Sequence, residues 1–144
     1  MPQDILAVVP QSVIYHPPCL AVGVGCNRGT PAEEIEQAID QTLADAGLDG
    51  RSIDQLATIE DKAGEMGLLA ACQRRNWRLK IFTRQEIAAI TTIPTPSVWA
   101  QRVLGVPGVA EPAAMLAAHT ESLLVEKRKF PNVTVAVAVV NVEL

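Results

Sequence analysis

The sequence predicts an α/β fold, a single three-layer domain whose mostly parallel sheet ends in a C-terminal antiparallel hairpin. Short apolar runs alternate along the chain with segments of helical periodicity, the pattern of strands linked by covering helices. Two Thr-x-x-Glu capping boxes mark helix starts. The valine-rich segment 133–142 has the apolar continuity of a central strand.

Five apolar runs predict strands, at 20–25, 56–59, 79–82, 123–125 and 133–142. The segment 126–132 joins the last two, and its length suits a loop within an antiparallel hairpin. Polar or glycine residues follow the strands, so the loops after Gly25, Ile59 and Val125 are the candidate ligand loops. Ligands of such sheets bind at the carboxyl ends of the strands.

Helix-start signals lie between these strands. Thr30, followed by Pro31 and Glu33, predicts a capping box and a helix that ends before Gly47. Four further helices are predicted at 65–75, from a second capping box at 83–86, at 97–104 with Ser97 as its cap, and at 111–119. Trp77 and Trp99 are interpreted as packing residues.

Composition limits the classes of protein that the chain can belong to. Of 144 residues, 49% are hydrophobic and only 3% aromatic, which favours one aliphatic core and disfavours base-stacking surfaces for nucleic acid. The net charge is −4, so we expect no nucleic-acid partner. Residues 20–144 are expected to form the domain, and residues 1–19, with four prolines, are expected to be a leader arm.

The sequence also predicts an intracellular setting. No apolar run reaches the ~20 residues of a spanning helix, and the N-terminus lacks the pattern of a secretory signal. We therefore expect a cytoplasmic protein without a membrane partner. Three cysteines at unrelated spacings fit neither a disulfide framework nor a zinc site. No metal and no cofactor are expected.

The glycine loop between the first strand and its helix is the clearest candidate binding site. It consists of Gly25, Cys26, Asn27, Arg28, Gly29 and Thr30. Free amides at a helix start favour anions, and the guanidinium of Arg28 suits carboxylate or phosphate. The spacing departs from both G-x-G-x-x-G and the P-loop. Nucleotide or phosphate binding therefore remains an alternative, as does a purely structural turn.

Cys26 has two interpretations. A thiol before a helix N-terminus can have a lowered pKa and act as a nucleophile. No histidine lies near it in the sequence, which favours a small buried residue instead.

Ordered motifs show a resemblance to a known family. Residues 23–30 resemble the G-x-G-C-R-R-G-T signature of the CobE and CbiG C-terminal family of cobalamin biosynthesis, with Asn27 in place of its first arginine. Residues 58–62 are similar to its T-x-D-x-K motif. Residues 105–114 match G-V-x-x-V-x-E-P-A-A, and residues 127–136 match K-x-K-x-x-x-V-T-x-A. The resemblance covers about residues 20–140.

This resemblance implies a role in a pathway whose intermediates are cyclic tetrapyrroles bearing acetate and propionate carboxylates. The principal hypothesis is a carrier or accessory factor that binds a polycarboxylate precorrin. The expected substrate-binding residues are Gly25, Cys26, Asn27, Arg28, Gly29, Thr30, Thr58, Lys62, Lys127 and Lys129. Basic side chains near the strand ends suit such a ligand, although residues 127–129 would also suit a solvated hairpin tip.

Two alternatives remain open. One is a hydrolase that opens a lactone on cobalt-precorrin-5A, with Glu60 or Glu111 as the catalytic carboxylate. For each carboxylate, a structural role is the competing interpretation, with Glu60 at the surface and Glu111 satisfying amides at a helix start. The other alternative is the nucleotide- or phosphate-binding module. Expected partners are a precorrin, other enzymes of the pathway, and a second copy of the chain, since a homodimer is the default for a small metabolic domain.

Overall fold

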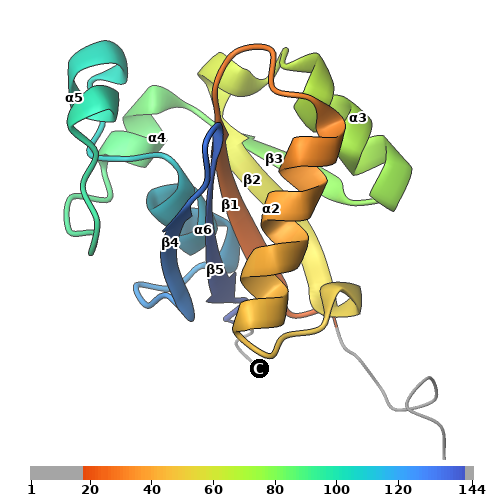
Figure 1. Cartoon of the computed structure of the whole chain (residues 1–144). Helices are drawn as coiled ribbons and strands as arrows, with labels where there is room; N and C mark the ends of the chain where they lie inside the picture. The colour runs from red at the N-terminus through yellow and green to blue at the C-terminus, as the bar shows by residue number, and fades with distance from the viewer. Residues whose placement is uncertain (1–17, 142–144) are drawn as a thin grey trace, which may run out of the picture.

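The sheet has the strand order β3-β2-β1-β5-β4 (Figure 1). The computed structural model describes residues 18–141, so residues 1–17 of the expected leader arm lie outside the described residues. The strands are β1 (Leu20–Cys26), β2 (Ile53–Ile59), β3 (Arg78–Phe82), β4 (Val125–Lys129) and β5 (Val133–Val139). β1, β2 and β3 pair in parallel, whereas β5 pairs antiparallel with β1 and β4. Four strands run one way and β5 the other, which confirms the predicted sheet.

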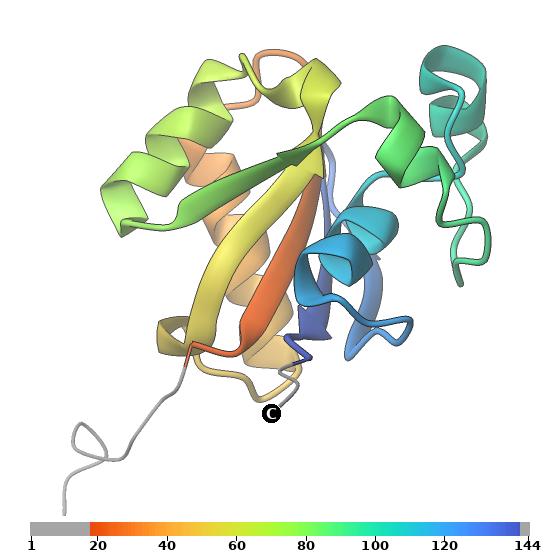
Figure 2. The ribbon, with the colours of Figure 1, turned by 180° about the vertical axis from the view of Figure 1, so that it is seen from behind.

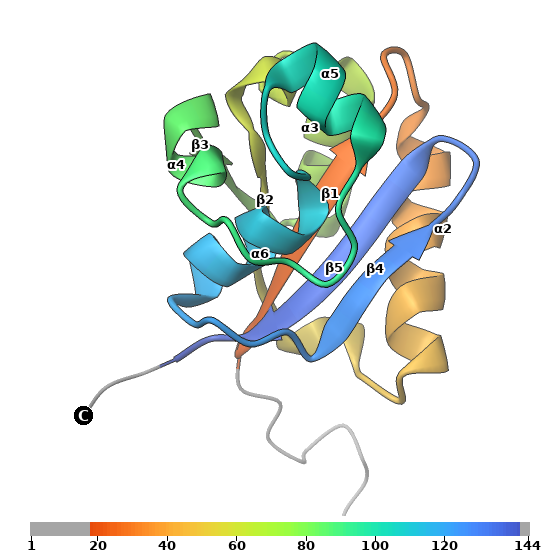
Figure 3. The ribbon, with the colours of Figure 1, turned by 90° about the vertical axis from the view of Figure 1, so that its left-hand side faces the viewer.

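Helices cover both faces of this sheet, which confirms the three layers. They are α2 (Ala32–Asp45), α3 (Met66–Arg75), α4 (Arg84–Ala88), α5 (Val98–Leu104) and α6 (Ala110–Ala118), with two 3₁₀ turns, η2 (Gly50–Ser52) and η3 (Glu60–Lys62). α2 and α3 lie on one face, and α6 lies on the other together with α4 and α5 (Figures 2 and 3). No helix within residues 18–141 is long and apolar enough to cross a membrane.

The alternation of large and small residues in β1 decides what packs on each face. Val22 and Val24 are fully buried among the side chains of α2 and α3. Gly23 faces α6, where a Cβ on it would lie 1.9 Å from the carbonyl oxygen of Ala110. The alanine-rich α6 therefore rests almost directly on the backbone of β1, and this close approach requires glycine.

Two of the predicted helix caps are confirmed. The hydroxyl of Thr83 accepts from the backbone N–H of Glu86 at 3.0 Å, and the carboxylate of Glu86 accepts from that of Thr83 at 2.9 Å. The hydroxyl of Ser97 accepts from the backbone N–H of Ala100 at 3.1 Å, at the start of α5. These two local signals were sufficient to place α4 and α5.

The predicted capping box at Thr30 is wrong, although its helix is present as α2. Thr30 is buried, and its hydroxyl donates to the carbonyl of Asn27 at 2.7 Å. Pro31 occupies the N-cap position, and no side chain caps the helix. Glu33 instead pairs with Arg74 of α3 at 2.7 Å. The tertiary partner thus replaced the local one, because α3 packs beside α2.

The predicted boundary of the hairpin is also wrong. Residues 126–129 belong to strand β4 and not to the loop, which is limited to 130–132. The ladder with β5 includes a bulge between Val125 and Arg128. β4 is an edge strand, where charged residues are common because they discourage pairing with other chains. Its high charge therefore did not prevent strand formation.

Candidate functional site

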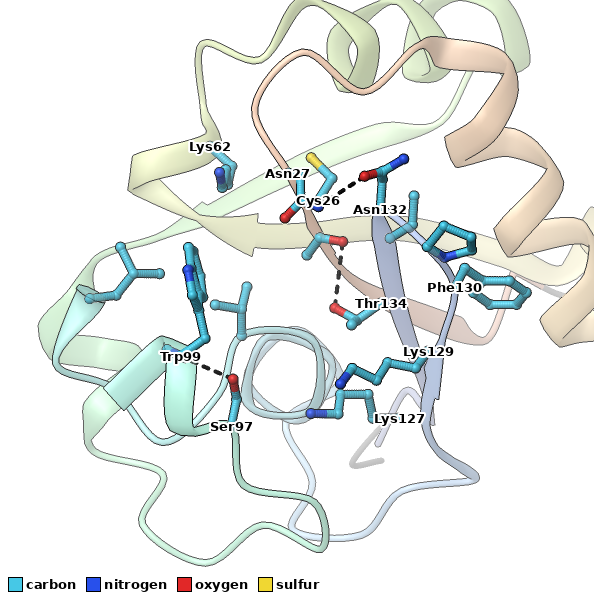
Figure 4. A pocket seen from close by; sticks show the side chains of 16 residues that line it. Cys26, Asn27, Lys62, Ser97, Trp99, Lys127, Lys129, Phe130, Asn132 and Thr134 are labelled. Carbon is cyan, nitrogen blue, oxygen red and sulfur yellow. Dashed lines mark hydrogen bonds between the residues drawn. The ribbon is translucent and has the colours of Figure 1, made fainter. Parts of the chain in front are cut away.

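A cavity of about 270 Å³ opens at the sheet edge where β1, β2 and β4 end and β5 begins (Figure 4). It is lined by the end of β1, by η3, by α5 and its flanks, and by the β4–β5 hairpin. The lining residues are Gly25, Cys26, Asn27, Lys62, Ser97, Trp99, Ala100, Leu104, Val109, Lys127, Lys129, Phe130, Pro131, Asn132, Val133 and Thr134. The cavity lies where strand-end ligand sites are expected in such sheets.

Strand β4 directs its basic residues to both faces. Lys127 and Lys129 line the cavity, whereas Arg128 between them forms an ion pair with Asp45 at the end of α2, at 2.8 Å. Burial lowers the pKa of Lys127 below its ordinary value, with a further lowering from Lys129 and an opposing effect from Glu111. The two-residue period of a strand therefore supplies two amines to one cavity.

A third amine reaches the cavity from another element. Lys62 of η3 is half-buried and borders the cavity opposite Lys127 and Lys129 (Figure 4). Among the residues that the structure describes, no Asp, Glu or His side chain lines this cavity. A protein of net charge −4 thus carries a locally cationic cavity that suits an anionic ligand.

The cavity also has aromatic and apolar walls. Trp99 of α5 borders it on one side, and the hairpin that carries Phe130 lies on the other (Figure 4). Leu104 and Val109 also line it. Trp99 was expected to be a packing residue, yet its exposed fraction is 51%. Val98 beside it is also exposed, with an exposed fraction of 69%.

Three of the six glycine-loop residues expected to bind substrate line the cavity, namely Gly25, Cys26 and Asn27. Asn27 is tied to Asn132 of the hairpin by two hydrogen bonds. Its backbone N–H donates to the Asn132 carbonyl at 2.9 Å, and its amide Nδ2 donates to Oδ1 at 3.0 Å. Asn132 was missed because it joins the site only through the hairpin.

The other half of the glycine loop turns away from the cavity. Arg28, Gly29 and Thr30 do not line it, and Arg28 is exposed. The amide of Gly29, which we expected to be available to an anion, donates to the carboxylate of Glu65 at 2.9 Å. An internal carboxylate therefore already occupies the anion position of this loop.

Cys26 is a buried thiol at the cavity wall. Burial raises its pKa to about 11, only partly offset by the nearby charge of Lys62. At neutral pH the side chain is therefore an uncharged thiol, in agreement with the interpretation as a small buried residue.

Thr58 and Glu60 lie at the carboxyl end of β2 without lining the cavity. The hydroxyl of Thr58, which is fully buried, donates to the carbonyl of Val24 at 2.7 Å and links β2 to β1. One carboxylate oxygen of Glu60 accepts from the backbone N–H of Arg84 at 2.8 Å, at the start of α4. Both side chains thus have structural partners in this state of the protein.

Glu111 is a buried carboxylate in the first turn of α6, with an exposed fraction of 1%. Oε1 accepts from the backbone N–H of Thr95, and Oε2 accepts from that of Lys127, both at 2.9 Å. It does not line the cavity. Both oxygens therefore hold neighbouring segments together, and a catalytic role for Glu111 stays a prediction.

The described residues offer no evident metal centre. Within residues 18–141, no group of three or more His, Cys, Asp or Glu side chains is placed to hold a metal ion.

A family model and curated proteins match this chain. The model described as Cobalamin synthesis G C-terminus matches residues 20–138. The chain is 41% identical over 134 residues to the cobalt-precorrin-5A hydrolase of Priestia megaterium, covering 93% of this chain and 36% of that protein. It is 33% identical over 121 residues to Protein CobE of Sinorhizobium sp, covering 83% and 79%. The chain spans 35–45% of the length of the curated hydrolases that it matches.

Solved structures share the fold. The crystal structure of CobE, a protein from the cobalamin (vitamin B12) biosynthetic pathway, superposes with a TM-score of 0.80 and 28% identity, over 92% of this chain and 99% of that one. Cobalamin biosynthesis protein chiG from Agrobacterium tumefaciens str. C58 gives a TM-score of 0.64 and 25% identity, over 82% and 95%. The expected α/β fold is thus confirmed by independent structures.

Proposed function

This chain belongs to the Cobalamin synthesis G C-terminus family, and from that premise we propose that its cavity binds a polycarboxylate precorrin intermediate. The chain then acts as a carrier or accessory factor of cobalamin biosynthesis. The observation that carries the proposal is the convergence of Lys62, Lys127 and Lys129 on one cavity whose described lining holds no carboxylate.

The charges of the cavity complement those of such a ligand. Acetate and propionate carboxylates surround the rim of a precorrin, and each can accept hydrogen bonds from an ammonium group. A charge-assisted hydrogen bond contributes about 1.5–3 kcal/mol. Three amines at separate points of the rim also fix the orientation of the ring, since each selects one carboxylate.

The size of the cavity indicates how much of the ligand enters. A volume of about 270 Å³ lies just below the ~300–1,000 Å³ of typical small-molecule pockets. One edge of the macrocycle, with its carboxylates, therefore enters the cavity, and the remainder of the ring stays outside. A carrier that binds one edge of the macrocycle leaves the opposite edge accessible to an enzyme.

Hydrolysis of a precorrin lactone is the second candidate, supported by the 41% identity to a protein named cobalt-precorrin-5A hydrolase. Binding is preferred because no described Asp, Glu or His side chain lines the cavity and the chain spans 36% of that relative. Should the chain hydrolyse a lactone, Glu60 is the better base. It follows β2 in the same 3₁₀ turn as Lys62, whereas both oxygens of Glu111 are engaged.

Nucleotide or phosphate binding has less support. The carboxylate of Glu65 already accepts the Gly29 amide in the glycine loop, and a phosphate there would have to displace it.

The proposal is tested by titrating the protein with uroporphyrin III, a stable octacarboxylate tetrapyrrole, and following its absorbance. We expect saturable binding that weakens with added salt, weaker binding of the tetracarboxylate coproporphyrin III, and no binding of AMP. Absence of saturable uroporphyrin binding would overturn the proposal, and binding of AMP alone would favour the phosphate module.

A second assay distinguishes the carrier from the hydrolase. Cobalt-precorrin-5A is incubated with the protein, and lactone opening is followed by mass spectrometry as the gain of one water, together with the loss of acetaldehyde where the two-carbon fragment leaves. The carrier leaves the lactone intact over many equivalents, whereas multiple turnovers that are lost in Glu60→Gln would establish the hydrolase.

A further inference from the structure

We propose that Trp99 contacts the face of the bound tetrapyrrole and determines specificity for a flat ring over other polycarboxylates. This inference rests on the proposed function. It names the side chain that contacts the ring, while the lysines bind the carboxylates of the ring. Resemblance to the family assigns no such role, because Trp99 lies outside every motif that carries the resemblance.

The two tryptophans of the chain have different surroundings. Trp77 is partly buried against the core, with the guanidinium of Arg75 5.0 Å from its ring centroid. Trp99 borders a cavity, yet 51% of its surface is exposed. A large indole that is half-exposed at a cavity wall is typical of a side chain whose apolar partner is a ligand.

The amines of the cavity lie around the same space as Trp99. Lys62, Lys127 and Lys129 line the cavity that Trp99 borders (Figure 4). Phe130 also lines it, but its ring packs against the α2 side of the sheet, with the guanidinium of Arg128 5.8 Å from the ring centroid. The cavity therefore combines the face of one indole with cationic groups. A tetrapyrrole combines the complementary features, an apolar ring with an anionic rim, whereas a flexible aliphatic polycarboxylate has no flat surface for the indole.

The position of Trp99 is set at both ends of its helix. The backbone N–H of Ser97 donates to the carbonyl of Pro107 at 2.8 Å, and that of Thr95 donates to Glu111. Ala100 and Leu104 anchor the inner side of α5 in the body of the protein. The helix that carries the indole is therefore held at the cavity before a ligand arrives, which limits the entropy lost on binding.

The test is an ¹⁵N–¹H NMR titration with uroporphyrin III, run beside the absorbance titration on the same protein. The chain has two indole N–H resonances, one for each tryptophan, and Trp77→Phe and Trp99→Phe assign them. A porphyrin ring current acts only at short range. We expect the Trp99 resonance to move and to saturate with the absorbance signal, while that of Trp77, which precedes β3 at the far end of the parallel strands, stays in place.

Affinity supplies the second measurement. Trp99→Ala should weaken uroporphyrin binding about tenfold, in line with the contribution of an aromatic stacking partner. Trp99→Phe should keep most of the affinity, because it keeps an aromatic face. Val103→Ala is the matched control, since Val103 is exposed on the same helix and does not line the cavity, and it should bind like the unmodified protein.

The outcomes separate this inference from the proposed function. Saturable absorbance binding with an unmoved Trp99 resonance would overturn the contact and leave the proposed function standing. The same holds if Trp99→Ala binds as tightly as the unmodified protein. Absence of any absorbance binding would overturn both.

Discussion

Glu111 and Lys127 are joined by a hydrogen bond of 2.9 Å, in which the backbone N–H of Lys127 donates to the buried carboxylate. That N–H lies in the β4 bulge between Val125 and Arg128, where the ladder with β5 is interrupted. The other carboxylate oxygen accepts from Thr95, on the segment that leads to α5. One carboxylate thus joins the strand that bears the cavity amines to the segment that bears the cavity tryptophan.

Replacing Glu111 should therefore destabilise the protein. Glu111→Ala removes the buried acceptor of two backbone N–H groups, and we expect the free energy of unfolding to fall by about 2–4 kcal/mol. Glu111→Gln should cost less, because its amide oxygen still accepts one of the bonds. Urea unfolding followed by circular dichroism measures both, with the exposed Glu121→Ala as control. Unchanged stability in Glu111→Ala, together with lost lactone opening, would instead indicate a catalytic carboxylate.

Gly23 should tolerate no side chain. A Cβ there would lie 1.9 Å from the carbonyl oxygen of Ala110 and 2.8 Å from the backbone nitrogen of Ala114. Gly23→Ala must push α6 off the sheet, and we expect a loss of about 2–3 kcal/mol or more in unfolding free energy. Gly64→Ala is the matched control, because a Cβ at Gly64 would meet no atom within 4 Å. Equal stability of the two variants would contradict the close packing of α6 on β1.

Binding of a carboxylate ligand should weaken as the pH rises through the alkaline range. The ligand requires protonated amines, and burial lowers the pKa of Lys127, so Lys127 loses its proton before an ordinary lysine does. Uroporphyrin affinity measured between neutral pH and about pH 10, where ordinary lysines begin to titrate, should show this early loss. Lys127→Arg, whose guanidinium stays charged, should retain affinity to higher pH. An identical pH profile in this variant would exclude Lys127 as a ligand contact.

Cys26 should react slowly with thiol reagents in the native protein. Because burial raises its pKa to about 11, only about one thiol in a thousand is ionised at pH 8. Mass spectrometry after brief alkylation should find Cys26 unmodified in the folded protein and modified in urea. Cys72, buried with its pKa also raised to about 11, is the internal control. Selective labelling of Cys26 under native conditions would indicate an activated thiol.

Local and periodic signals predicted most of the fold. The capping box at Thr83 and the cap at Ser97 depend on residues three apart, and both formed as expected. At Thr30 the same kind of signal failed. The carboxylate of Glu33, which the capping box required, accepts a hydrogen bond from Arg74 of α3 instead. Tertiary partners of this kind are invisible in a sequence window.

The sequence predicted those cavity residues that lie at or just after the ends of strands. Lys62, Lys127 and Lys129 follow or end strands, and all three line one cavity. Trp99 and Asn132 were missed, since their participation depends on how α5 and the hairpin fold back over the sheet. Arg28 stands next to cavity residues in the sequence but not in the cavity, because the chain turns toward α2 after Asn27.

The proposed binding depends on Lys127 and Lys129 facing the cavity while Arg128 faces α2. Uroporphyrin III affinity at low and high salt, measured for Lys127→Ala, Lys129→Ala and Arg128→Ala, compares three adjacent cations that differ in the face they occupy. We expect each lysine variant to bind about tenfold more weakly and to lose part of its salt dependence, as for the loss of a charge-assisted contact. Arg128→Ala should bind like the unmodified protein. Equal weakening in all three variants, or in none, would contradict binding in this cavity.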